Sequence, residues 1–341
     1  MMRAFQVTEP GTIQPIEKEM PAIQRADEVL IQVKRVGICG SDLHIIHGSN
    51  PMAVYPRVIG HEVAGVVEAV GSGVTEVCLG DRVVLEPICS CGECYACRIG
   101  RANVCEKLQV YGVHRDGGCQ EYMVLPVRNL HRLTDHVDIS EAALVEPFTI
   151  GAQANWRGGV QKGDVVFIIG AGPTGLCCLN IAKAKGAICI ISDLSEERLA
   201  FARQWGADHT IHAASVDVCA EVLRLTQQMG ANIVIDAVGS PTLVEDAVHV
   251  ASVAGRVVTL GFSEQPSQLT QVDMTKKELT IAGSRLQTDQ FPQVVQWFND
   301  GTIQPGEMIS HHFPMEEIQS AVRLIENEPN RVRKVLLHVN E

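Results

Sequence analysis

The sequence predicts an α/β fold: a doubly wound parallel sheet joined to a second domain rich in strands. Two observations predict it. Between residues 148 and 284, short apolar runs alternate with helical segments, which is typical of a parallel sheet with helices on both faces. Residues 1–147 instead show short strands separated by frequent Gly and Pro. A chain of 341 residues is long enough for both domains.

The strand-rich part contains two clear strand candidates. Residues 28–36 partly alternate between apolar and polar side chains, and residues 62–70 are β-branched and apolar and end at Gly71. The last part of the chain, 285–341, is mixed and ends in a strand-like run at 334–339. We expect this tail to return to the first domain, so that residues 1–147 and 285–341 form one domain and 148–284 the other.

The alternating part is predicted element by element. Strand Val165–Ile169 precedes a helix at 173–185 that Gly186 closes. Ser195 is the predicted N-cap of a second helix, because acidic residues fill the first turn after it. The remaining predicted elements are strands at 187–192, 209–211, 232–236, 256–260 and 279–283, and helices at 195–204 and 215–228.

Bulk composition excludes some partners and compartments. The formal net charge is −12 and no basic run is present, which argues against a nucleic-acid partner. No apolar stretch approaches the roughly 20 residues that span a bilayer, and the N-terminus lacks a signal-peptide pattern. We therefore expect a cytoplasmic protein, where cysteines remain reduced and a tight cluster of them more often binds metal than forms disulfides.

A glycine-rich turn follows strand Val165–Ile169 and opens the next helix, which is the context of a dinucleotide site. Its glycines allow a tight turn, a close approach of the pyrophosphate and close helix–strand packing. Asp193 ends the next strand, where a carboxylate binds ribose hydroxyls and repels a 2′-phosphate, so we predict NAD. A turn that binds nothing is the alternative. The predicted contacts are Gly170, Gly172, Pro173, Thr174, Gly175, Asp193, Arg198, Leu260, Phe262 and Ser284.

A cluster of four cysteines lies within fifteen residues: Cys91, Cys94, Cys97 and Cys105. Four thiolates at this spacing suit a closed tetrahedral zinc site that stabilises a loop. Disulfides and an iron–sulfur site are the alternatives. Cys89 lies beside this set, and we interpret it as a non-ligand.

Further ligand-type residues are spread along the first domain. Cys39, Ser41 and His44 fall in one turn, the pair His61-Glu62 follows about twenty residues later, and Glu146 precedes the change of domain. Taken alone, each has an ordinary structural interpretation: Cys39 as a buried thiol, His61 as a core histidine and Glu146 as a solvated carboxylate. Together with a cofactor turn and a zinc cluster, they indicate a catalytic metal site.

These motifs resemble those of the zinc-containing medium-chain dehydrogenases, in the branch of the sorbitol, threonine and bacterial hexonate dehydrogenases. The resemblance covers essentially the whole chain and implies a GroES-like catalytic domain with an inserted Rossmann domain. Segment 110–118 is most similar to L-galactonate and L-gulonate 5-dehydrogenases. The matching segments are 37–42 (Gly-Ile-Cys-Gly-Ser-Asp), 60–62 (Gly-His-Glu), 91–105, 146–147 (Glu-Pro) and 170–175.

The resemblance implies roles for individual residues. Cys39 and His61 would bind a catalytic zinc, with Glu62 as a ligand or alternating with water. Glu146 would be a ligand or hold the zinc-bound water. Ser41 would lie beside the substrate hydroxyl and His44 would extend the proton path. The resemblance also implies a homodimer or homotetramer that pairs the edges of its Rossmann sheets.

The sequence thus predicts a zinc-dependent, NAD-linked dehydrogenase that oxidises a secondary hydroxyl. The hypothesis for its substrate is a hexonate such as L-gulonate or L-galactonate, oxidised at C5 in sugar-acid catabolism. His114 and Arg285 are candidates to bind the carboxylate, and Glu146 also lies in the predicted substrate site. The alternatives are a sorbitol-type polyol or L-threonine dehydrogenase, a zinc-free reductase of the same superfamily and a non-catalytic NAD-binding sensor.

Overall fold

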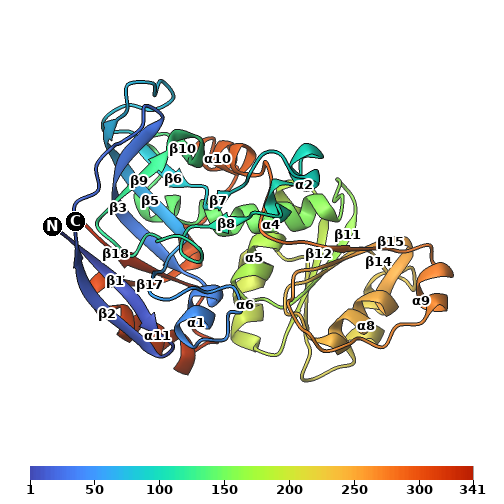
Figure 1. The fold of residues 1–341 in the computed structure, drawn as a ribbon. Helices are drawn as coiled ribbons and strands as arrows, with labels where there is room; N and C mark the ends of the chain where they lie inside the picture. Colours follow the sequence, from blue (N-terminus) through green and yellow to red (C-terminus); the bar gives the residue numbers. More distant parts are fainter. Residues whose placement is uncertain (341) are drawn as a thin grey trace. The chain divides into compact units, whose positions relative to one another are not determined.

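The computed structural model describes residues 1–340, and their contacts divide into two units (Figure 1). Unit 1 comprises Met1–Glu146 and the chain from Phe291 on, and unit 2 comprises Pro147–Gln290. The division falls close to the predicted boundaries, one residue before residue 147 and six residues after residue 284. No helix among the described residues combines the length and apolar character needed to cross a bilayer.

Unit 2 is built on a six-stranded parallel sheet in the order β13-β12-β11-β14-β15-β16. This confirms the predicted doubly wound sheet. The order reverses between β11 and β14, which places a switch point at the carboxyl ends of those two strands. The strands are β11 (Val165–Ile169), β12 (Ile188–Asp193), β13 (His209–His212), β14 (Ala231–Asp236), β15 (Ala251–Thr259) and β16 (Thr280–Gly283).

Alternate residues of each central strand pack into two different cores. Val166 and Ile168 pack with helices α5 and α6 on one face, whereas Phe167 packs with α8 on the other. Helix α8 was not predicted, although it begins with a proline and buries Ala247 and Val248. The helices are α4 (Val145–Arg157), α5 (Pro173–Ala184), α6 (Glu196–Gln204), α7 (Val218–Leu225), α8 (Pro241–Val250) and α9 (Gln271–Thr275).

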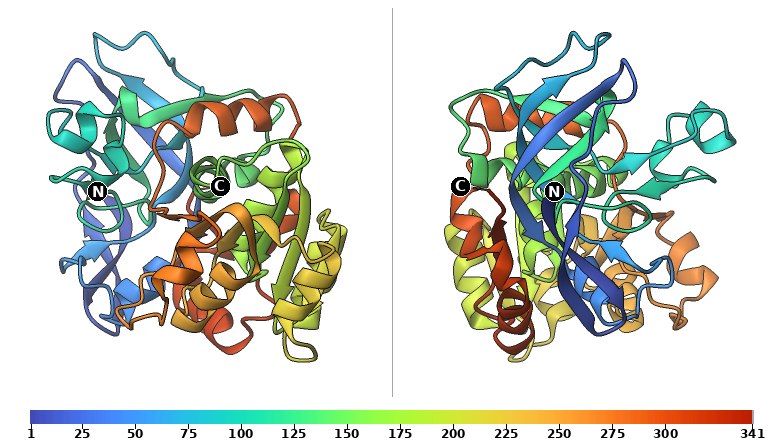
Figure 2. Two further views of the ribbon diagram at one scale, coloured as in Figure 1. Left: turned by 90° about the vertical axis from the view of Figure 1, so that its right-hand side faces the viewer. Right: turned by 60° about the vertical axis from the view of Figure 1, so that its left-hand side comes forward.

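Unit 1 contains a mostly antiparallel sheet in the order β10-β6-β5-β3-β18-β17, with β9 also paired to β3. The chain's last strand, β18, pairs with β3, so the C-terminal segment lies beside the N-terminal strands (red against blue in Figure 2). The strands of this sheet are β3 (Glu28–Ile38), β5 (Glu62–Val70), β6 (Arg82–Leu85), β9 (Tyr122–Pro126), β10 (Leu130–Leu133), β17 (Ile309–Pro314) and β18 (Lys334–His338).

Shorter elements complete unit 1. A second sheet orders β2-β1-β4, and β7 pairs with β8 at the base of the cysteine-containing lobe. These elements are β1 (Met2–Glu9), β2 (Thr12–Lys18), β4 (Arg57–Val58), β7 (Ile88–Cys89) and β8 (Gln109–Val110), with helices α1 (Gly40–Ile46), α2 (Tyr95–Arg98), α3 (Ile139–Ala142), α10 (Phe291–Asn299) and α11 (Ile318–Asn327).

Candidate active site and metal centres

Two neighbouring strands bring the predicted catalytic ligands together. Cys39 follows β3 directly and is the N-cap of α1, while His61 and Glu62 stand at the start of β5. In the antiparallel register, Glu62 lies opposite Gly37. As a result, one ligand atom each of Cys39, His61 and Glu62 lies within 4.8 Å of the others. A thiolate, an imidazole and a carboxylate at this spacing form a donor set that suits zinc.

Asp42, which the sequence analysis did not single out, fixes this arrangement. Its carboxylate accepts hydrogen bonds from the backbone N–H of Cys39 at 2.9 Å and of Gly60 at 3.2 Å. It also lies 3.4 Å from Nδ1 of His61. Burial opposes a charge on His61, but the neighbouring Asp42 carboxylate raises the pKa of His61 well above its ordinary value. A carboxylate on one ring nitrogen orients a histidine so that its other nitrogen can bind metal.

Segment 110–118 forms a support beneath His61. The backbone N–H groups of Gly117 and Gly118 donate to the carbonyls of Val58 and Gly60 at 2.7 and 2.8 Å. A Cβ at position 117 would lie 2.1 Å from the Gly60 carbonyl oxygen. Because only glycine allows this approach, the segment that resembles hexonate dehydrogenases has a structural role in unit 1. His114 uses Nδ1 to accept from the Val110 N–H at 3.1 Å within its own loop.

Glu62 is held by a lysine from the end of the chain. Nζ of Lys334, on β18, lies 2.6 and 2.8 Å from the two carboxylate oxygens of Glu62. The side chains are 3% and 1% exposed, so the pair is buried. Lys334 was not predicted as a site residue, and the available signal was one lysine at the start of a mostly apolar strand.

Glu146 approaches the same group from the first turn of α4. It is buried, and burial raises its pKa to about 7. His61 and Lys334 oppose this shift, whereas the carboxylate of Glu62 adds to it. Glu146 is therefore buried near these charged groups, but the group whose ligand atoms lie within 4.8 Å of one another comprises Cys39, His61 and Glu62, without Glu146.

The predicted proton path starts on α1. Oγ of Ser41 lies 3.4 Å from Nε2 of His61, beside the ligand set. His44 follows three residues later, on the same helix face. Its Nδ1 lies 2.9 Å from Oγ of Ser49, and its side chain is exposed to solvent.

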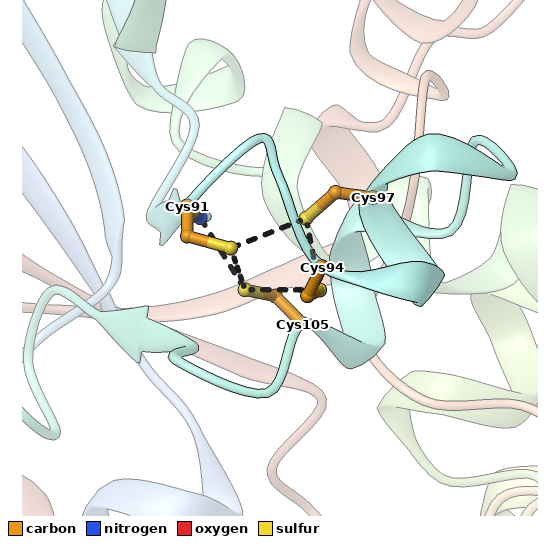
Figure 3. Close-up of side chains that lie close together, drawn as sticks. All are labelled: Cys91, Cys94, Cys97 and Cys105. Carbon is orange, nitrogen blue, oxygen red and sulfur yellow. Dashed lines mark hydrogen bonds between the residues drawn. The ribbon is translucent and has the colours of Figure 1, made fainter.

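The four clustered cysteines converge in the lobe around α2 (Figure 3). Their Sγ–Sγ distances are 3.4 Å for Cys91–Cys105, 3.5 Å for Cys94–Cys97, 3.9 Å for Cys94–Cys105 and 4.0 Å for Cys91–Cys97. These are far longer than a disulfide bond and surround the value of about 3.8 Å expected for a Zn–S tetrahedron. All four cysteines are free. The group therefore has the geometry of a closed structural zinc site.

The glycine turn at β11 has the shape of a phosphate cradle. Gly170 has φ +95°, and a Cβ on Gly175 would lie 1.8 Å from the Gly170 carbonyl oxygen. Gly172 is the N-cap of α5 and Pro173 its first residue. Asp193 accepts from the Ala171 N–H at 2.8 Å, which places its carboxylate at the turn. This arrangement fits a dinucleotide whose pyrophosphate binds at the helix N-terminus.

Of the other predicted cofactor and substrate residues of unit 2, Leu260, Phe262, Ser284 and Arg285 follow strands β15 and β16, whereas Thr174 and Arg198 lie in the first turns of α5 and α6. Nη1 of Arg198 is 3.7 Å from Asp193, and the Arg285 guanidinium carbon stands 5.8 Å from the centre of the Phe262 ring. Phe262 is exposed, while Ser284 is buried and its N–H donates to Thr259. Their roles, and those of Thr174 and Leu260, remain predictions.

Comparison with known proteins agrees with this geometry. Residues 25–135 match the family model of the alcohol dehydrogenase GroES-like domain, and residues 173–300 match that of zinc-binding dehydrogenases. The chain is 40% identical to the starvation-sensing protein RspB of Escherichia coli K12, with all of both chains covered. It is 37% identical to L-galactonate-5-dehydrogenase of the same strain, with 87% of each chain covered.

A solved structure shows the same fold. The crystal structure of an alcohol dehydrogenase (rspB) from E. coli CFT073, complexed with NADH, superposes with a TM-score of 0.94 at 40% identity and covers 99% of each chain. The predicted family, fold class and cofactor classes, zinc and a nicotinamide dinucleotide, are thereby confirmed. The chain belongs to the zinc-dependent alcohol and polyol dehydrogenases, oxidoreductases that act on CH–OH groups.

Proposed function

We propose that this enzyme uses NAD to oxidise a secondary hydroxyl group of a sugar acid, with a hexonate such as L-gulonate or L-galactonate oxidised at C5. The observation that carries the oxidation chemistry is the group of Cys39, His61 and Glu62 donor atoms within 4.8 Å of one another. The 37% identity to L-galactonate-5-dehydrogenase supports the substrate class. This identity supports the substrate class more strongly than the resemblance of segment 110–118 does. The glycines of that segment have a structural role, since they hydrogen-bond to the backbone just before His61.

The residues divide the chemistry between them. Cys39 and His61, with Glu62 or Glu146, would hold the catalytic zinc, and Cys91, Cys94, Cys97 and Cys105 the structural one. When bound, zinc supplies a Lewis acid that favours the alkoxide form of the alcohol, and NAD supplies the hydride acceptor. Ser41 would accept the hydroxyl proton as it gives its own proton to His44, and the exposed His44 would pass that proton to solvent.

The proposed cofactor contacts and one proposed substrate contact are residues of unit 2, and His114 belongs to unit 1. Asp193 would bind the adenosine ribose hydroxyls and disfavour a 2′-phosphate, and Arg198 would lie beside it. Arg285 is the candidate cation for the substrate carboxylate, and His114 is a separate candidate donor. We further propose a cytoplasmic homo-oligomer that pairs through the edge strand β16, where Ile281 is 38% exposed.

A substrate panel tests the proposal. NADH formation is measured with L-gulonate, L-galactonate, sorbitol and L-threonine, before and after zinc removal. The proposal expects chelator-sensitive turnover of a hexonate and little turnover of sorbitol or threonine. Turnover of sorbitol or threonine instead would keep the mechanism and reject the substrate class, and absence of any turnover from a zinc-loaded protein would favour a sensor.

The carboxylate contact has its own test. Arg285→Ala should raise KM for the hexonate and leave turnover of an uncharged polyol unchanged. Arg323→Ala, on α11 of unit 1, serves as a matched control for loss of one arginine. An unchanged KM in Arg285→Ala would reject the contact.

A further inference from the structure

Asp236 is a buried carboxylate at the switch point of unit 2. It ends β14, pairs with Ile169 at the end of β11, and is fully buried. One oxygen, Oδ1, accepts hydrogen bonds from the backbone N–H groups of Val238 and Gly239, both at 3.0 Å. The other oxygen, Oδ2, has no hydrogen-bond partner among the residues that the structure describes.

Stability alone does not favour a carboxylate here. Transfer of a charged group into the interior costs free energy, and hydrogen bonds compensate only one of the two oxygens of Asp236. What the carboxylate adds is a turn of fixed shape, because hydrogen bonds to a charged acceptor are about twice as strong as those between neutral groups. Asp236 thus fixes the backbone of residues 237–240, the β14 loop, at some cost in stability.

The β14 loop fits between two other loops at the same edge of the sheet, as β14 itself lies between β11 and β15. A Cβ on Gly170, in the glycine turn, would lie 2.6 Å from Cγ2 of Val238. A Cβ on Gly239 would lie 2.6 Å from Cα of Gly261, which follows β15. The β14 loop is therefore closely packed on both sides, and it leaves Val238 56% exposed beside the glycine turn.

The two halves of the sheet suit the two halves of a dinucleotide. Asp193, proposed to bind the adenosine ribose, ends β12 on one side of the switch point. The β14 loop lies on the other side, in the half that is left for the nicotinamide. An exposed apolar side chain on a fixed loop, such as Val238, suits packing against a flat ring.

We propose that Asp236 is a positioning residue that holds Val238 in place for the nicotinamide half of the cofactor. Asp236 is buried and acts only through the β14 loop. The inference rests on the proposed function in that Asp193 marks the adenosine half. Loss of Asp236 should therefore weaken binding of the whole dinucleotide and spare binding of its adenosine half.

Calorimetric titration with NADH and with AMP tests this, since AMP carries only the adenosine half. Asp236→Ala should raise the Kd of NADH about tenfold and leave that of AMP unchanged. Asp236→Asn keeps an oxygen acceptor for the two N–H groups and should recover most of the NADH affinity. Asp208→Ala is the control, because Asp208 accepts from the Cys189 N–H at 2.7 Å but precedes β13, at the opposite edge of the sheet. It should titrate as the wild type.

Other outcomes would overturn the proposal. A wild-type Kd for NADH in Asp236→Ala would show that the loop does not depend on the carboxylate. Equal weakening of NADH and AMP would show that Asp236 only supports unit 2, and failure of Asp236→Asn to recover affinity would show that the two hydrogen bonds are not the cause.

A second variant covers the case in which Asp236→Ala does not fold. Val238→Ala changes an exposed side chain: weaker NADH binding with unchanged AMP binding supports the proposal, and unchanged NADH binding rejects it. A wild-type protein that binds neither NADH nor AMP would instead contradict the proposed use of NAD.

Discussion

The two metal-type sites of unit 1 are built in opposite ways. The thiolate cluster draws four identical donors from fifteen consecutive residues, and its Sγ atoms surround one point. The Cys39 site draws different donors from two strands, receives Glu146 from α4 and is buttressed by Lys334 from the end of the chain. The first site needs only a local loop, and we call it the closed site. The second depends on contacts between distant segments of unit 1, and we call it the open site, because a catalytic zinc keeps one position for substrate.

The largest expected effect is on turnover at the open site. Cys39→Ser should lower kcat by about a thousandfold or more, because it removes a ligand of the metal that supplies several kcal/mol of transition-state stabilisation. Zinc content should fall from two per chain to one, with little change in thermal unfolding. Turnover near the wild-type value would show that chemistry does not depend on this site.

The closed site should respond in the opposite manner. Cys105→Ser breaks the tetrahedron, and loss of a structural metal is among the few changes that cost several kcal/mol. We expect a fall in Tm of about 6–12 °C. A loss of about 3 kcal/mol in the free energy of unfolding lowers Tm by about 2–4 °C for each kcal/mol. At a temperature where the protein stays folded, kcat should change little. A strong loss of kcat without loss of stability would contradict the division between the sites.

Close packing at the open site gives a third, smaller effect. Gly37→Ala forces its Cβ against Glu62, and we expect a loss of about 1–3 kcal/mol in the free energy of unfolding, as for other overpacked positions. Gly40→Ala is the matched control, because a Cβ there has no neighbour within 4 Å. Urea unfolding of both variants measures the difference. Equal stability would show that Glu62 can move without cost.

The smallest effect concerns the support beneath His61. Asp116 accepts hydrogen bonds from Lys18 at 2.7 Å and Arg57 at 2.9 Å. Burial raises the pKa of Asp116, but the hydrogen bonds and charges of its partners outweigh it and hold the pKa below the ordinary value. The ionised Asp116 carboxylate therefore stabilises the folded protein at any pH above the pKa that Asp116 has in the unfolded chain. This stabilisation is lost as the pH falls through the lower pKa that Asp116 has in the folded protein.

Asp116→Asn should accordingly destabilise the protein by about 1 kcal/mol at neutral pH, with a smaller difference from the wild type in acid. Unfolding in urea at several pH values measures this. Asp135→Asn, at an exposed aspartate, provides the comparison. A difference that stays constant below pH 4 would show that the charge of Asp116 is not the cause.

The parts that the sequence determined alone are those that depend on neighbours in the chain. The spacing Cys91 to Cys105 predicts a closed site, because a short loop can fold four thiols around one point. The glycine turn at 170–175 and the N-cap Ser195, whose side chain accepts from the Arg198 N–H, follow likewise from local backbone chemistry.

Tertiary structure alone decided how the open site is held. Asp42 and Lys334 are ordinary polar residues in sequence, and only the pairing of β3 with β5 and β18 brings them to Glu62 and His61. Hydrogen bonds from Gly117 and Gly118 to the backbone just before His61 give segment 110–118 a structural role that its resemblance to hexonate dehydrogenases did not reveal. The physical reason is that a buried charge needs a partner, and the partner is set by how strands pair and not by sequence spacing: Asp42 lies 19 residues from His61, and Lys334 lies 272 residues from Glu62.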